Sequence, residues 1–156
     1  MRMSRWLVLN NAFQKNLYSK GVENTDITGG FATYAYVPDT STNATQKLTV
    51  TKNSDSITLK SAAGYGGSLF SENTINLTHA RVLKMEVSAA NPNGGYINVG
   101  VSATKQNKFV RTAHALVEGS GTISVDVSQL SGSYYMFINL RGSTVQTMTF
   151  TNWWIE

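Results

Sequence analysis

The sequence contains no cysteine, which excludes disulfide bonds, thiol nucleophiles and thiolate-bound zinc. This absence does not assign a compartment, because a cysteine-free chain is stable in oxidising and in reducing surroundings. With 156 residues, the chain has the size of one domain that buries about two thirds of its unfolded surface. We therefore expect a folded unit that needs neither a metal nor a covalent cross-link.

Charged residues are scarce as well. They make up 14% of the chain, against about 25% in an average soluble domain, so Ser, Thr, Asn and Gly must supply most of the polar surface. The 13 Lys and Arg residues leave a net charge of +4, but they occur singly and form no basic run of the kind that follows a phosphate backbone. We expect no nucleic-acid partner.

Long apolar runs are missing too. No stretch approaches the roughly 18 consecutive apolar residues of a transmembrane helix, so we expect no membrane insertion. The N-terminal stretch MRMSRWLVLNNAFQ places two arginines before an apolar patch, as a secretory signal does. The patch WLVL is shorter than the roughly seven apolar residues that a signal needs, and no A-x-A cleavage site follows it. We therefore expect no signal peptide.

Groups that carry out chemistry are few: the chain has two histidines and nine acidic residues. His114 lies within an expected strand and His79 at the end of one, where a structural role is favoured over that of a general base. Glu86 and Asp126 alternate with apolar neighbours, which indicates solvated side chains, not the paired acids of a glycoside hydrolase. The glycine-rich stretch 64–68 lacks the lysine of a phosphate loop. We expect no enzyme, no catalytic residues, no metal and no cofactor.

Short alternating segments, separated by turn signals about every ten residues, are what the sequence does contain. Gly and Asn occupy joints such as 91–95 and 118–122, where hairpins favour positive φ angles. This pattern predicts an all-β antiparallel sandwich of about nine strands. The expected strands are 31–37, 47–51, 56–61, 81–89, 96–103, 108–117, 122–127, 133–140 and 145–155.

The first 16 residues fit this pattern less well. Apolar residues at helical spacing allow a short helix, whereas the stretch RWLVL could equally pair as a strand. We interpret residues 1–16 as an attachment or oligomerisation arm in front of a sandwich domain at 17–156. The side chains expected to dock this arm are Trp6, Leu7, Leu9 and Phe13.

One expected strand, in GSYYMFINLRG at 132–142, has apolar or aromatic groups on both faces. Tyr134, Met136, Ile138 and Leu140 share one face, which suits a core. The opposite face, together with the strand at 96–103, predicts a contact surface that contains Tyr96, Asn98, Tyr135, Phe137, Asn139 and Arg141. Rings beside amide and guanidinium groups suit a glycan or a protein partner. The third interpretation is that another part of the chain covers this face.

Two stretches carry a resemblance to a known group of proteins. LYSKGVENTDITGGF at 17–31 and GTISVDVSQLSGSYYMFINLRGSTVQTMTFTNWWIE at 121–156 resemble small β-sandwich proteins of tailed phages and prophages of Gram-positive, clostridia-like bacteria. The resemblance implies a jelly-roll of the carbohydrate-binding-module type, used in a tail, baseplate, fibre or capsid-decorating position. Residues 1–16 depart from that pattern, because they are longer and more apolar than the group's opening.

The leading hypothesis is therefore a non-enzymatic virion structural protein, made in the host cytoplasm and resident in the phage particle. Its expected partners are other virion proteins or sister subunits, with which it would form an oligomer. The alternative hypothesis is a glycan-binding module that recognises a host cell-surface polysaccharide. The leading hypothesis docks the protein through the N-terminal arm, the alternative uses the contact surface, and neither requires a cofactor.

Overall fold

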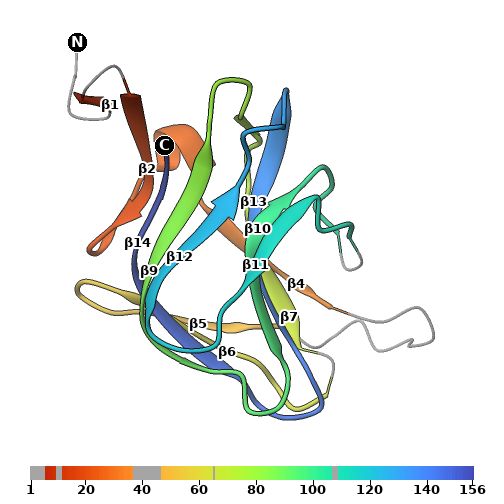
Figure 1. Cartoon of the computed structure of the whole chain (residues 1–156). Coiled ribbons are helices and arrows are strands. Elements are labelled where there is room, and N and C mark those ends of the chain that lie inside the picture. The colour runs from red at the N-terminus through yellow and green to blue at the C-terminus, as the bar shows by residue number, and fades with distance from the viewer. Residues whose placement is uncertain (1–5, 10–11, 37–46, 65, 107–108) are drawn as a thin grey trace.

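The computed structural model describes residues 6–9, 12–36, 47–64, 66–106 and 109–156 (Figure 1). For residues 6–9, 12 and 13 it describes the course of the backbone and not the side chains. Strands dominate the described residues, and every strand pair is antiparallel. The all-β expectation is confirmed.

The first sheet has eight strands in the described part of the chain. Its longest path runs β1-β2-β14-β6-β5, with β9 on the other side of β14, β12 beside β9, and β3 beside β2. The bounds are β1 Trp6–Leu9, β2 Ala12–Ser19, β3 Val22–Glu23, β5 Thr49–Lys52, β6 Ile57–Lys60, β9 Val82–Asn91, β12 Gly121–Asp126 and β14 Thr147–Ile155.

The second sheet has six strands among the described residues, in the order β11-β10-β13-β7-β4, with β8 beside β13. The bounds are β4 Phe31–Ala35, β7 Gly67–Ser71, β8 Ile75–Asn76, β10 Tyr96–Ser102, β11 Ala113–Leu116 and β13 Ser133–Arg141. One four-residue helix, α1 (Thr25–Thr28), precedes β4, and Gly29 ends it in the left-handed conformation with φ of 69°. Within the described ranges, no helix is long and apolar enough to cross a membrane.

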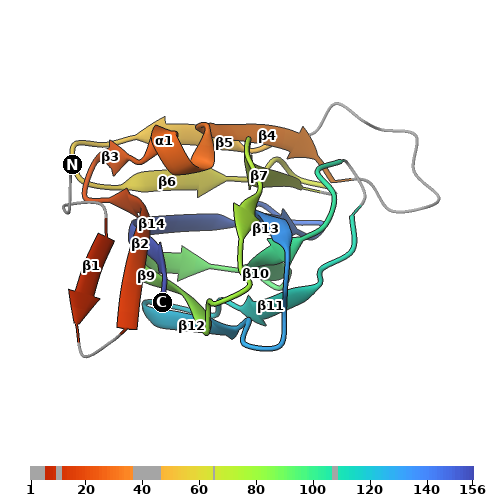
Figure 2. The ribbon, with the colours of Figure 1, turned by 90° about the horizontal axis from the view of Figure 1, so that it is seen from above.

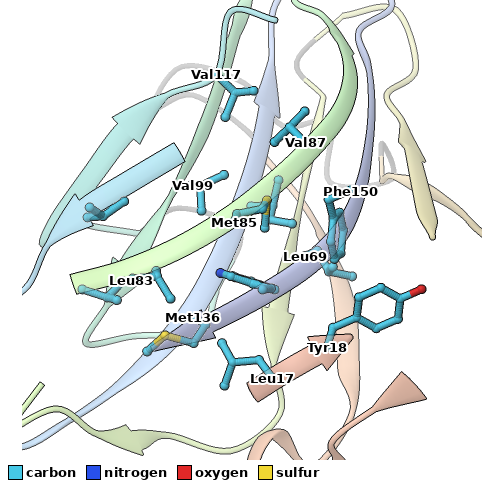
Figure 3. Close-up of a cluster of buried hydrophobic side chains, with 14 of the residues drawn as sticks. Leu17, Tyr18, Leu69, Leu83, Met85, Val87, Val99, Val117, Met136 and Phe150 are labelled. Carbon is cyan, nitrogen blue, oxygen red and sulfur yellow. The ribbon is translucent and has the colours of Figure 1, made fainter. Parts of the chain in front are cut away.

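Figure 2 shows the arrangement of the strands from above. The two sheets pack face to face, and one main apolar cluster lies between them. Figure 3 shows how side chains of the two sheets meet: Leu83 and Met85 from β9 lie in the same cluster as Val99 from β10 and Met136 from β13. Each of these strands turns alternate residues inward, as a sheet with one core face must. The sandwich expectation is confirmed at this level.

All nine expected segments contain a strand, but the described residues hold fourteen strands in total. Among the strands not expected, β7 has all five residues buried, so it shows no alternation. Residues 6–9 form a strand and not a helix, because β1 pairs with β2 along this range. The boundary drawn at residue 16 lies inside β2, whose residues Lys15 and Asn16 pair with β14.

The long strand β14 joins the parts of the first sheet. One edge pairs with β6 along Thr147–Phe150 and with β2 along Asn152–Ile155, while the other edge pairs with β9. The register shifts between Phe150 and Asn152, which leaves Thr151 without a partner on β9. This bulge moves the inward positions from Met148 and Phe150 to Trp153 and Ile155, an offset that regular alternation does not allow.

The two adjacent tryptophans occupy different environments, as strand geometry requires. Trp153 is completely buried, stacks on Phe31 with ring centroids 5.6 Å apart, and meets Phe150 edge to face at 5.9 Å. Trp154 is half-buried, and its indole N–H donates a hydrogen bond of 3.0 Å to Glu156 Oε1. Of the two adjacent tryptophans, Trp153 therefore belongs to the core.

Replacing Trp153 with Ala should lower the free energy of unfolding by about 3–5 kcal/mol, because it empties a closed site between the sheets. The neighbouring variant Trp154→Ala is the matched control and should lose less than half as much. Chemical denaturation followed by far-UV circular dichroism measures both values. Equal losses in the two variants would show that the inward phase of β14 is assigned wrongly.

Candidate binding site

The outer face of the second sheet carries the expected contact surface. Strand register places Tyr96 opposite Arg141, Asn98 opposite Asn139, and Ser102 opposite Tyr135. On the other side of β10, Leu116 of β11 lies opposite Asn98. These residues therefore share one face, as the sequence predicts, while Ile97, Val99 and Val101 point into the main core.

A second, smaller cluster of rings covers part of this face. Phe109 precedes β11 and packs edge to face on Phe70 and on Phe137, with centroids 4.8 Å apart in both pairs. Tyr36, just after β4, packs against Phe109 at 5.9 Å. Tyr34 extends the group by an edge contact of 5.6 Å with Phe70. Phe109, from the segment before β11, thus forms a lid over the middle of the sheet.

This cover corrects the expected contact surface. Phe137 and Asn139 are fully buried, and so is Asn98 apart from 4% of its surface. Tyr135 is half-buried against the ring cluster, 5.4 Å from the ammonium of Lys105. Of the six expected residues, Tyr96 alone is exposed, and Arg141 is partly accessible. For Phe137 and Asn139 the interpretation as intramolecular cover is the correct one.

The uncovered end of the same face forms a pocket of about 530 Å³. Tyr96 and Asn98 of β10, Arg141 of β13 and the adjoining Gly142 line it on one side. Three further lining residues come from β11 or the segment before it: Arg111, His114 and Leu116. Tyr96 and Leu116 leave 58% and 50% of their surfaces exposed, so the pocket has apolar surface open to a ligand.

Polar contacts hold the remaining lining groups in place. Asn98 Oδ1 lies 3.2 Å from His114 Nδ1, so the two side chains share a hydrogen bond across neighbouring strands. Arg111 donates a hydrogen bond of 3.4 Å to the Tyr36 hydroxyl. The guanidinium carbons of Arg111 and Arg141 lie 5.7 Å and 5.2 Å from the centre of the Tyr36 ring, within the range of cation–π contacts.

The sequence interpretation missed Arg111, His114 and Leu116 as members of the site. Alternation along the strand could have placed His114 and Leu116 on the outer face, because they alternate with Ala113 and Ala115, which pack on the main core. A strand next to β10 would then place them beside Asn98. Arg111 carried no such signal, since it lies in the segment before β11, outside any strand, and its place in the site depends on how that segment packs.

The pocket is positively charged. Its described lining contains two arginines and no Asp or Glu. Loss of water around the imidazole lowers the pKa of His114, and the positive charge of Arg111 lowers this pKa further. Within the described ranges, no three His, Cys, Asp or Glu side chains gather as a metal site would require. The arrangement suits binding through rings, hydrogen-bond donors and positive charge.

The docking residues expected in the N-terminal arm belong to the first sheet and not to the sheet that carries the pocket. Trp6, Leu7 and Leu9 belong to β1 and Phe13 to β2, at the edge of the first sheet. Their side chains lie outside the part of the chain that the structure describes.

In comparisons with known proteins, no family model, curated protein or solved structure matches this chain.

Replacing Arg111 with Gln should raise the pKa of His114 without restoring its ordinary value of 6.5, because the dominant cause, loss of water, remains. NMR titration of the imidazole protons measures this pKa. Because the pKa of His114 is lower in the folded chain than in the unfolded chain, the unfolded chain binds this proton at a higher pH as the pH falls. The wild-type contribution of His114 to stability is therefore lost as the pH falls below about 6.5. An unchanged pKa in the variant, as expected for the control Lys60→Gln, would exclude a charge effect of Arg111.

Proposed function

We propose that this protein is a non-enzymatic, carbohydrate-binding β-sandwich that takes up a polysaccharide in the pocket at the open end of the second sheet. The observation that carries the proposal is the pair of accessible apolar side chains, Tyr96 and Leu116, beside hydrogen-bonding groups in one concave site. As part of the proposal we assign the sandwich to the jelly-roll type, which the resemblance of 17–31 and 121–156 implies.

The chemistry of the lining supports a sugar ligand. A pyranose ring has an apolar C–H face that stacks on a flat ring such as Tyr96, and hydroxyl groups that need directional partners. Amide, imidazole and guanidinium groups from Asn98, His114 and Arg141 supply such partners. The pocket volume also lies within the roughly 300–1,000 Å³ that is usual for ligand sites.

The position of these groups on strands favours binding. Tyr96, Asn98, His114 and Leu116 lie on β10 and β11, which pair with each other, so their spacing is set by the sheet. Side chains held by regular elements bind with less loss of freedom than side chains on loops. A hydrolase of the common type would need two carboxylates facing the sugar, and the described lining offers none.

Replacing Tyr96 with Ala should weaken binding to the recognised polysaccharide about tenfold, since the variant loses the stacking surface. A glycan array of bacterial cell-wall polymers identifies the ligand, and isothermal titration calorimetry then measures the dissociation constants. Val22→Ala is the matched control, because Val22 is also strongly exposed but belongs to the first sheet. Undiminished binding by the Tyr96 variant, or no binding to any polymer, would refute the proposal.

A second candidate function combines the resemblance of 17–31 and 121–156 with the position of the N-terminal strands. We infer that the protein is a structural component of a phage virion, in which β1 attaches the sandwich to other virion proteins or to sister subunits. In the described sheet, β1 is an end strand, paired with β2 alone. An end strand presents unpaired backbone groups to which a strand of another chain can add. The two functions are compatible, because β1 and the pocket belong to different sheets.

Deleting residues 2–9 should abolish incorporation into the particle and leave a folded sandwich, because it removes β1 and keeps β2. Deleting 2–16 is a poorer test, since it also removes residues of β2 that pair with β14. Mass spectrometry of purified particles measures incorporation, and circular dichroism reports folding. Normal incorporation of the folded deletion variant would exclude the attachment role of β1.

A further inference from the structure

We propose that the pocket recognises an acidic saccharide, whose carboxylate or phosphate group binds between Arg111 and Arg141 while its sugar ring lies against Tyr96 and Leu116. This inference rests on the proposed carbohydrate-binding function and names the class of its ligand. The juxtaposition that carries it is two arginines and an open apolar surface in one pocket with no acidic lining residue.

Neither arginine has a carboxylate partner in the described part of the chain. Salt bridges in that part join, for example, Lys52 to Glu23, Lys84 to Glu156 and Lys105 to Glu72. Three lysines are thus neutralised elsewhere on the surface, whereas the two pocket arginines contact a tyrosine. Two like charges in one concavity raise the local positive potential, which a bound anion would offset.

Contacts with the Tyr36 side chain hold both arginine side chains in position in the pocket. Tyr36 is 6% exposed and is held by Phe109, so it is a fixed support. Arg111 makes both a hydrogen bond to its hydroxyl and a contact with its ring, while Arg141 contacts the ring. Because these contacts restrict the side chains before the ligand arrives, less conformational entropy is lost on binding. Each guanidinium has five N–H donors, so donors are left for an anion.

The same lining argues for an acidic sugar over a bare anion. A guanidinium matches the planar carboxylate of a uronic acid and the oxygens of a sugar or polyol phosphate. Tyr96 and Leu116 offer exposed apolar surface that a free inorganic ion would leave uncovered. In the strand register Asn98 lies opposite Leu116 and His114 lies opposite Gly100 on the same face, so their polar groups adjoin this apolar surface and can meet hydroxyl groups.

The test compares polymers that differ in charge. Polygalacturonate and its methyl ester share one backbone, and a phosphomannan supplies phosphate on a sugar ring in place of carboxylate. Titration calorimetry at about 150 mM salt limits unspecific attraction to the basic surface. We expect at least one of the two anionic polymers to bind about tenfold or more tightly than the neutral ester. The anionic polymer that binds identifies the source of the charge.

Variants then locate the effect. Arg111→Gln and Arg141→Gln should each weaken binding of the anionic polymer about tenfold more than they weaken binding of the neutral ester. Arg141→Lys keeps the charge and the stem but loses the planar fork, so an intermediate loss is expected. Lys60→Gln is the matched control, because it removes one positive charge from β6 in the other sheet. Circular dichroism and thermal melting show that each variant is folded.

The outcomes separate this inference from the function on which it rests. Equal binding of ester and acid, lost in Tyr96→Ala and changed to the same extent for both polymers in each Arg→Gln variant, would overturn the acidic ligand and retain the carbohydrate-binding function. Absence of binding to every saccharide, charged or neutral, would overturn both. A single-stranded oligonucleotide that binds through the same arginines more tightly than any saccharide would overturn the saccharide assignment.

Discussion

The packing of Phe109 on Phe70 and Phe137 decides what the outer face of the second sheet can do. Without that lid, β13 would present a continuous row of rings and amides to solvent. With it, the middle of the sheet becomes a second small core, and the accessible surface contracts to one end. Tyr36 closes the cluster at that end, and its ring contacts the two arginines of the pocket.

This arrangement connects stability to binding. The main core between the sheets holds β10, β11 and β13 in register, and the register sets the spacing of the lining residues. The ring cluster fixes Arg111, which no strand carries. A rigid site with positive charge and open apolar surface suits recognition of a ligand. Its described lining lacks the acids that the common mechanism of sugar hydrolysis requires.

Much of the fold could be predicted because period-two alternation is a local property. The nine expected segments contain strands, and Trp153 and Trp154 occupy the different environments that adjacency in a strand predicts. Strand β7 was not predicted, because both of its faces are buried and its sequence therefore lacks the alternation of apolar and polar residues. The bulge at Thr151 could not be predicted from the sequence either, since it depends on pairing with β9 and not on the residues of β14.

The sequence alone determined the strand-rich fold class and placed Tyr96, Asn98, Tyr135, Phe137, Asn139 and Arg141 on one face of a sheet. Only the tertiary structure decided that Phe137 and Asn139 are covered, that Tyr96 and Arg141 line a pocket, and that Arg111, His114 and Leu116 complete it. The physical reason is that side-chain direction follows from neighbouring residues in a strand. Burial, in contrast, depends on contacts between segments far apart in the chain, here Tyr36, Phe70, Phe109 and Phe137.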